Sequence, residues 1–455
     1  MNIGDKQIEL INRAKKYLEK LKSSNINISM SSLCYFATWA DTPGCARLKL
    51  WHNGTFFLFK YYYLILKNIL AIASHAKYVE FGNQKKIDNP KILIVSWAFK
   101  NNFQPDGSYH DKYFNENSKN LPNSYWLLIS TDSYVPTNLN NNLKVLKLEK
   151  GFFKYNFFYF FKILITAIFE CKFSLKKILH YLSFHTYLAK RVSSVAKREL
   201  KRNNFDTVIM PYEGQPFQQM IFSEAKKLNE KILTIGYIHS MLTPFPGEHI
   251  YRPGSPDKLY VHGSSQIEIL KLKLNWPENK LFLINPLRFQ KDDKKSLSGQ
   301  IFLPRTILDK KILLNAFRDL VINSPSASFT KLDIRNHPAM FNSRKHLSLK
   351  MEIEKIMKIY KNRFSNISLD SKISIFFGVT AAIFEALEKG NEVIQICSDP
   401  VFESLSEKIW PNLKIKKLNN FAFHYNLVTR GKYINFSSNN KISTLKNSIL
   451  IKENL

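Results

Sequence analysis

The sequence predicts an α/β protein with two Rossmann-like domains that face a cleft, and with extra helices at the N-terminus. Short, continuously apolar segments recur along the chain, as expected for parallel strands buried on both faces. Segments with helical periodicity alternate with them, which is the pattern of βαβ units. A length of 455 residues is enough for two or three domains.

We expect four parts along the chain. Residues 1–84 form a helical N-terminal extension, and residues 85–256 form the first Rossmann-like domain. Residues 257–420 form the second domain, and residues 421–455 return to the first. The boundary is placed at the end of a long loop rich in proline and glycine, because long loops in compact domains usually serve a function or allow movement.

Three segments in the first half predict long helices. Residues 5–23 have a basic outer face, whereas residues 56–73 and 151–173 are rich in aromatic side chains. Lysines inside both aromatic segments argue against a membrane span, because charge in the middle of a bilayer is costly. Each aromatic helix fits either packing within the protein or attachment to a membrane surface.

Polar residues follow two strands of the first domain. Its predicted strands are residues 91–97, 125–130, 144–148, 205–210 and 231–239. Glu213 follows the fourth strand, just before a helix, where a catalytic acid or base belongs in an α/β sheet. A glutamate that only caps the helix is the alternative. His239 ends the fifth strand and is a candidate for contact with a ligand in the cleft.

The second domain is expected to begin with strands at residues 258–262, 281–284 and 300–304. Arg288 follows the second of them and is a candidate to face the cleft. A last strand is expected at residues 413–415, and a helix at residues 442–451 is expected to return to the first domain.

The central stretch of the second domain opens with K-L-D-I-R-N-H-P, residues 331–338. A short apolar strand leads to Arg335 and His337, and Pro338 favours an extended His337 because proline disfavours helical backbone in the preceding residue. A plain turn at the strand end is the alternative interpretation of the His-Pro pair.

The same stretch closes with a strand, a turn and a helix. Residues 375–377 are the strand, Gly378 allows the turn, and Thr380 stands where the N-cap of helix 381–387 would lie. Gly390 fits the end of that helix. A helix N-terminus with a hydroxyl group binds anions, and a neighbouring strand end faces the same crevice. The sequence therefore predicts a phosphate cradle, with a simple helix cap as the alternative for Thr380.

Composition narrows the class of protein. The formal net charge is +31, from 67 basic and 36 acidic residues, which fits either an anionic partner or a coding bias toward lysine. No nucleic-acid-binding module is visible, so no nucleic-acid partner is expected. Four scattered cysteines form no C-x-x-C pair, and the N-terminus has no signal-peptide pattern, so we expect a cytoplasmic protein. No metal-binding motif follows a strand, and no metal or cofactor is expected.

The order R-x-H-P, then G-x-T-x-x-x-F-E-A-L-x-x-G-x-x-V-I, resembles the C-terminal half of bacterial surface-polysaccharide glycosyltransferases of the GT-B type. It looks most like the sialyltransferases and Kdo transferases, which use CMP-activated acidic sugars. The resemblance covers about residues 206–396. One position departs from the family: Ala381 stands where the second hydroxyl of a Ser/Thr-Ser motif is expected, so either Thr380 acts alone with backbone amides or the motif is displaced.

The resemblance implies that residues 85–256 bind the acceptor and that residues 257–420 bind a nucleotide sugar, expected to be CMP-linked. Glu213 would be the general base, and His337 would assist at the leaving phosphate. The residues implied in contact with the nucleotide or its phosphate are Arg335, His337, Pro338, Gly378, Thr380 and Glu385. The acceptor would be a glycan or lipid-linked glycan, reached by peripheral contact with anionic lipid at the inner face of the cytoplasmic membrane.

Two other functions remain open. The same motifs are similar to those of the CDP-glycerol polymerases of teichoic acid synthesis, which would make the protein a CDP-polyol phosphotransferase. A non-catalytic scaffold on a membrane surface or on nucleic acid would use the basic charge and the aromatic helices, but it gives no role to Glu213, His337 or Thr380.

Overall fold

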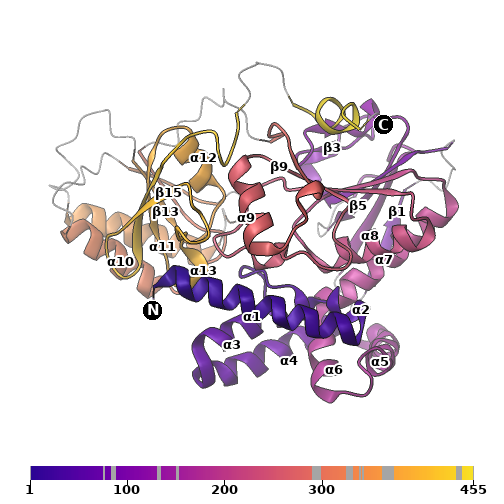
Figure 1. The fold of residues 1–455 in the computed structure, drawn as a ribbon, viewed down its shortest axis with the longest axis horizontal. Coiled ribbons are helices and arrows are strands. Elements are labelled where there is room, and N and C mark those ends of the chain that lie inside the picture. Colours follow the sequence, from indigo (N-terminus) through magenta and orange to yellow (C-terminus); the bar gives the residue numbers. More distant parts are fainter. Residues whose placement is uncertain are drawn as a thin grey trace.

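The computed structural model describes residues 2–74, 77–82, 89–130, 135–149, 153–288, 299–323, 332–337, 340, 343–360, 373–436 and 443–453. Figure 1 shows two α/β units side by side, with a group of helices from the N-terminal half of the chain packed along one side of them. The predicted fold class, two Rossmann-like units with extra N-terminal helices, is confirmed.

The first unit contains a sheet of eight strands in the order β1-β6-β5-β2-β7-β8-β9-β10. Their bounds are β1 Lys77–Phe81, β2 Ile92–Ala98, β5 Ser124–Ser130, β6 Leu143–Glu149, β7 Thr207–Pro211, β8 Leu233–Tyr237, β9 Lys258–Val261 and β10 Leu281–Leu283. All pairs are parallel except β1 with β6. Counted from β2, the first six parallel strands have the 3-2-1-4-5-6 order of a doubly wound sheet, whose order reverses between β2 and β7.

Both faces of this sheet are covered, because its strands are apolar on both sides; helices pack against one face, and the segment around residues 109–121 packs against the other. The helices of the unit are α5 Phe153–Glu170, α6 Leu175–Tyr181, α7 Phe184–Arg202, α8 Pro216–Leu228 and α9 Ser264–Leu274. A second core cluster on the other face includes Leu445, Ile449 and Leu450. Leu445 is the N-cap of the C-terminal turn, a π-helix at Lys446–Leu450 that contains Ile449 and Leu450, so this turn packs on the first unit.

The second unit contains six strands in the order β12-β11-β13-β14-β16-β15. Their bounds are β11 Gln300–Phe302, β12 Asp333–Arg335, β13 Ile373–Phe377, β14 Glu392–Ile396, β15 Leu413–Lys417 and β16 Ala422–Leu427. The helices are α10 Lys310–Asn323, α11 Arg344–Ile359, α12 Ala382–Glu388 and α13 Pro400–Glu403. Strand β11 lies between β12 and β13 and is parallel to both, so the strand order reverses at β11.

Two expectations about chain segments differ from the structure. Strands β9 and β10 hydrogen-bond within the first sheet, so the sheet of the second unit begins at β11 and not at residue 257. Strand β15 is followed by β16, so residues 413–415 are not the last strand. The interpretation of a long loop as a domain boundary failed because the loop before β9 only connects two neighbouring strands of one sheet.

The N-terminal helices join the two units. Helix α1 Ile3–Ser24 is followed by α2 Ile26–Ser29, α3 Pro43–Asn53 and α4 Leu58–Ser74. Near the start of α1, the buried Gln7 amide donates to the carbonyl oxygens of Val401 and Ser404 at 2.9 Å, both in the second unit. Near its end, Asn25 donates to the Glu170 carbonyl at 2.8 Å. The helix therefore contacts both units, as Figure 1 shows.

The segment Pro43–Ile72, which contains α3 and α4, is long and apolar enough to cross a membrane by length and composition. One face of it packs inside the protein, where Tyr61, Leu64 and Ile65 form a small core cluster. The shorter described elements are the strands β3 His110–Asp111 and β4 Glu116–Asn117 and the 3-10 turns Ser32–Cys34, Gly54–Phe57, Lys100–Asn102, Ser118–Asn120, Gly247–His249 and Glu278–Lys280.

Candidate active site

Glu213 lies in a tight turn between β7 and α8. The Gln218 side-chain carbonyl accepts from the backbone N–H groups of Glu213 and Gln215, both at 3.0 Å, which fixes the turn from the first helical residues. Gly214 has φ +62°, and a Cβ there would lie 2.1 Å from the Glu248 carbonyl oxygen. The turn therefore requires glycine after Glu213 for two independent reasons.

A buried arginine holds this turn from below. Arg252 donates through Nη2 to the Gly214 carbonyl oxygen at 2.7 Å and through Nη1 to the Cys34 carbonyl oxygen. Cys34 belongs to the N-terminal helical region, so a single guanidinium group joins that region to the turn of the candidate base. Because charge-assisted hydrogen bonds are among the stronger ones in proteins, this contact restricts where Glu213 can move.

Glu213 and His239 lie together, as their positions on neighbouring strands β7 and β8 require. His239 Nε2 is 3.3 Å from Glu213 Oε1, and Gln215 donates to the other carboxyl oxygen. The Glu213 side chain is 27% exposed, so it reaches solvent. Burial raises the pKa of Glu213, while the Gln215 hydrogen bond and the charges of Arg305 and Arg288 oppose this rise.

His239 is neutral in this setting. Burial lowers the pKa of His239 well below its usual value, and Arg288 and two nearby histidines lower it further. The Tyr113 ring packs edge-on against the imidazole with 4.2 Å between centroids. A neutral imidazole protonated at Nε2 can donate to the Glu213 carboxylate, and its buried Nδ1 has no hydrogen-bond partner among the described residues.

On the second unit, His337 follows the end of β12 and its carbonyl oxygen accepts from the Met340 N–H at 2.8 Å. Burial lowers the pKa of His337, followed by the charges of Arg305, His346 and Arg288. Arg335 is the last residue of β12, half-buried at the same strand end. Pro338 lies outside the described residues.

Two exposed arginines connect the two halves of the site. Arg288 and Arg305 act on the pKa of both Glu213, on the first unit, and His337, on the second. Arg288 was a candidate from the sequence, and it follows β10. Arg305 was not, although it stands at the end of a predicted strand in the order Q-I-F-L-P-R, which is the signal that would have found it. It follows β11, where the strand order of the second sheet reverses and ligands usually bind.

The turn after β13 lies across β11 from His337. Strands β12 and β13 flank β11, so their carboxyl ends are about 10 Å apart, twice the spacing of neighbouring strands. Gly378 has φ +64°, and a Cβ there would lie 3.0 Å from Pro304, the residue before Arg305. Arg305 therefore stands between the Arg335–His337 strand end and the Gly378 turn.

Thr380 and Glu385 have local partners in α12. The Thr380 hydroxyl accepts from the Ala382 N–H at 3.3 Å, although the N-cap position is Ala381, one residue later than predicted. The helical dihedral angles of Ala381 extend the first turn back toward Thr380, whose hydroxyl still accepts from an N–H of that turn. Glu385 pairs with Lys389 at 2.7 Å one turn along the helix, and its expected contact with a nucleotide stays a prediction. Among the described residues, no group of three or more His, Cys, Asp or Glu side chains could hold a metal ion.

The strand order of the two sheets defines the protein as a two-unit, Rossmann-like α/β protein. Its candidate site lies at the carboxyl ends of the strands of both sheets. No family model matches the sequence, and no curated protein matches it significantly.

Among solved structures, the chain is similar to UDP-GlcNAc 2-epimerase from Neisseria meningitidis bound to UDP-GlcNAc, at 12% identity and a TM-score of 0.34, over 68% of this chain and 83% of that one. It is also similar to the UDP-forming α,α-trehalose-phosphate synthase from Burkholderia xenovorans in complex with glucose-6-phosphate, at 10% identity and a TM-score of 0.28, over 61% and 72%. The enzyme of that name from Burkholderia vietnamiensis gives 9% identity and a TM-score of 0.30, over 61% and 69%.

Proposed function

We propose that the protein is a glycosyltransferase that moves a sugar from a nucleotide donor, expected to be CMP-linked and acidic, to a glycan acceptor of a bacterial surface polysaccharide. The observation that carries this proposal is the pair Glu213 and His239 on one unit, together with two arginines, Arg288 and Arg305, whose charges act on both Glu213 and His337 of the other unit. Transfer of a sugar away from a phosphate leaving group requires a base that takes the proton of the attacking hydroxyl and cations that stabilise the departing phosphate.

Glu213 is proposed to take the proton from the attacking acceptor hydroxyl. Its raised pKa brings its basicity nearer to the working pH, and its exposed fraction gives the hydroxyl access. The neutral His239 orients the carboxylate through Oε1, while Gln215 holds the other oxygen. As the acceptor oxygen bonds to the anomeric carbon, the bond from that carbon to the donor phosphate oxygen breaks.

The charge that develops on the leaving phosphate is proposed to be stabilised by the cationic groups of the second half of the site. Arg305 stands at the centre, with Arg335 and His337 on one side and Thr380 on the other. These groups supply positive charge and N–H donors in fixed positions, which is how preorganised sites lower a barrier. In this proposal no metal ion is needed, since guanidinium groups neutralise the phosphate.

The acceptor is proposed to be reached at a membrane surface. Helix α4 and the turn before it carry an apolar stripe at helical spacing, in which Phe56 is 99% and Phe59 is 87% exposed. The other exposed members of the stripe are Tyr63, Leu66 and Leu70. Helix α5 packs beside α4 and adds exposed Phe161, Ile165 and Phe169. Such a surface is costly in water, and with nearby lysines it suits an anionic lipid surface.

The proposal is tested by thermal stabilisation of the purified protein with CMP, CDP, UDP and GDP, because a ligand that binds only the folded state raises Tm. We expect CMP to raise Tm and His337→Ala to remove that rise. A preference for UDP or GDP would contradict the acidic-sugar donor and keep the transfer reaction. No rise with any nucleotide would contradict the proposed function.

A further inference from the structure

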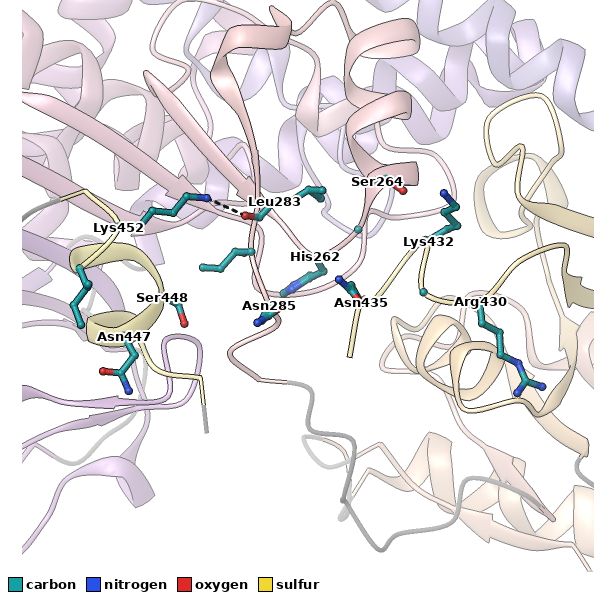
Figure 2. A pocket seen from close by; sticks show the side chains of 14 residues that line it. His262, Ser264, Leu283, Asn285, Arg430, Lys432, Asn435, Asn447, Ser448 and Lys452 are labelled. Atoms are coloured by element: carbon teal, nitrogen blue, oxygen red, sulfur yellow. Dashed lines mark hydrogen bonds between the residues drawn. The ribbon is translucent and has the colours of Figure 1, made fainter. Parts of the chain in front are cut away.

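A polar cavity of about 690 Å³ lies at the junction of the two units, and none of the residues proposed to act in the transfer lines it (Figure 2). It is built from four separate segments: the ends of β9 and β10, residues 430–435 after β16, and the C-terminal turn. Figure 2 shows His262, Asn285 and Asn435 directed toward the same space, with Asn447 and Ser448 across from them. Cavities of this size hold small ligands.

The lining of the cavity is cationic and rich in hydrogen-bonding groups. Arg430, Lys432 and Lys452 supply positive charge, and no described lining residue is acidic. The ion pairs found within the described part of the chain include none for Arg430 or Lys432. Lys452 donates to the Leu283 carbonyl oxygen at 3.3 Å. This acceptor is neutral, so the contact does not neutralise the charge of Lys452. The other polar lining side chains are Ser264, Asn285, Asn435, Asn447 and Ser448.

The segment that carries Lys432 is fixed to both units, so the cavity is a built feature. The Ser265 N–H donates to the Lys432 carbonyl oxygen at 2.9 Å, at the start of α9 in the first unit. The buried Glu388 carboxylate, at the end of α12 in the second unit, accepts from the N–H groups of Gly431 and, at 2.8 Å, Tyr433. Replacing Gly263 would place a Cβ 2.2 Å from the Lys432 carbonyl oxygen, so the two segments touch closely.

We propose that this cavity binds a small phosphorylated ligand that also bears hydroxyl groups, such as a sugar phosphate. The cations match a phosphate group, and the asparagine and serine side chains match hydroxyl groups, which both donate and accept. This proposal does not depend on the transfer reaction proposed above. Because Glu388 joins the cavity to α12, whose other end carries Thr380, a bound ligand is in a position to affect the candidate active site.

The test uses the full chain and two probes, glucose 1-phosphate and inorganic pyrophosphate, with binding followed by calorimetry. Lys432→Gln removes one cation, and we expect it to weaken binding of both probes roughly tenfold or more, as for the loss of a charge-assisted hydrogen bond. Ser448→Leu fills the cavity from another segment and should weaken binding as well. Lys20→Gln, an exposed lysine of α1, has the same charge change and should bind like the wild type.

His337→Ala separates this proposal from the proposed function. If the probes occupy the cavity, His337→Ala binds them normally while it loses the effect of CMP. Binding that is lost in His337→Ala and kept in Lys432→Gln and Ser448→Leu would place the phosphate in the candidate active site and overturn the proposal. The absence of binding to the wild type would overturn it too. Tighter binding of glucose 1-phosphate than of pyrophosphate supports a sugar phosphate, and the reverse result contradicts the hydroxyl-bearing ligand.

Discussion

The replacement Glu213→Gln tests the assignment of the base, because it keeps the shape of the side chain and removes its ability to take a proton. Glutamine retains one oxygen, so one of the contacts with His239 and Gln215 is kept and the other is lost. Arg252 still fixes the turn through the Gly214 carbonyl oxygen. The geometry of the site is therefore expected to survive the change.

We expect Glu213→Gln to lower the turnover strongly and to leave the stability at neutral pH unchanged or slightly higher. Loss of a general base lowers turnover by about 10²–10⁴-fold. The lost hydrogen bond costs only about 1 kcal/mol in free energy of unfolding. Burial raises the pKa of Glu213, so its contribution to stability is present at low pH and is lost as pH rises through the folded-state pKa. At neutral pH the variant escapes this penalty, and its Tm should be near or above that of the wild type.

The assay is turnover with a nucleotide sugar as a function of pH, beside nucleotide binding measured by the Tm shift. In the wild type, kcat/KM should rise with pH as Glu213 loses its proton, and the variant should lack this rise. His239 stays neutral through this range because its pKa is lowered. Glu224→Gln is the matched control, because Glu224 on α8 pairs with Lys197 of α7 and Lys227 of α8, away from the site. Full turnover in Glu213→Gln, or an equal loss in the control, would refute the assignment.

Three further predictions concern stability and membrane contact. Gly214→Ala should lower the free energy of unfolding by more than the about 1–2 kcal/mol of backbone strain at positive φ, since its Cβ meets a carbonyl oxygen; Gly431→Ala, with φ +78° and open space around the added Cβ, should show the strain alone in chemical unfolding. Burial raises the pKa of Glu248 to about 8, so the free energy of unfolding of the wild type should fall by roughly 3–5 kcal/mol as pH rises from the unfolded-state pKa toward 8. Glu248→Gln should flatten this pH dependence, which denaturation midpoints measured across pH would show. An unchanged pH dependence in the variant would contradict the buried carboxyl. Phe59→Ser should lower the affinity for anionic vesicles, measured by co-sedimentation, at least tenfold, because it loses about 1.5–3 kcal/mol of apolar burial. Met351→Ser changes an exposed residue of α11 and should leave this affinity unchanged. Equal effects of the two variants would argue against the apolar stripe as the contact surface.

Local pattern was enough to locate most elements and the strand ends that carry the candidate site. The apolar segments at residues 91–97 and 205–210 became β2 and β7 almost unchanged, because their residues are buried on both faces. Glu213 was chosen as a candidate because a polar residue that follows a buried strand marks the carboxyl edge of a sheet. Thr380 was predicted as the N-cap of α12, and the helix begins at Ala382, one residue later than expected, which is within the usual uncertainty of helix ends.

Other features of the site required the tertiary structure. The partnership of Glu213 with His239 depends on β7 and β8 being neighbours, and the sequence does not state strand order. Arg305 follows a strand of only three residues, Gln300–Phe302, and its importance comes from the position of that strand between β12 and β13. Arg252 and Glu248 stood in what looked like a loop, and only folding buries them beneath the candidate base.

The sequence by itself determined where the chain is apolar, where it turns and which side chains follow each strand, because these depend on residues near one another in the chain. Tertiary structure decided which sheet received β9 and β10, which helix joined the two units, and which charges act on Glu213 and His337. The physical reason is that strand pairing and burial are set by contacts between distant segments. The pKa of a side chain follows from that burial and from its neighbouring charges.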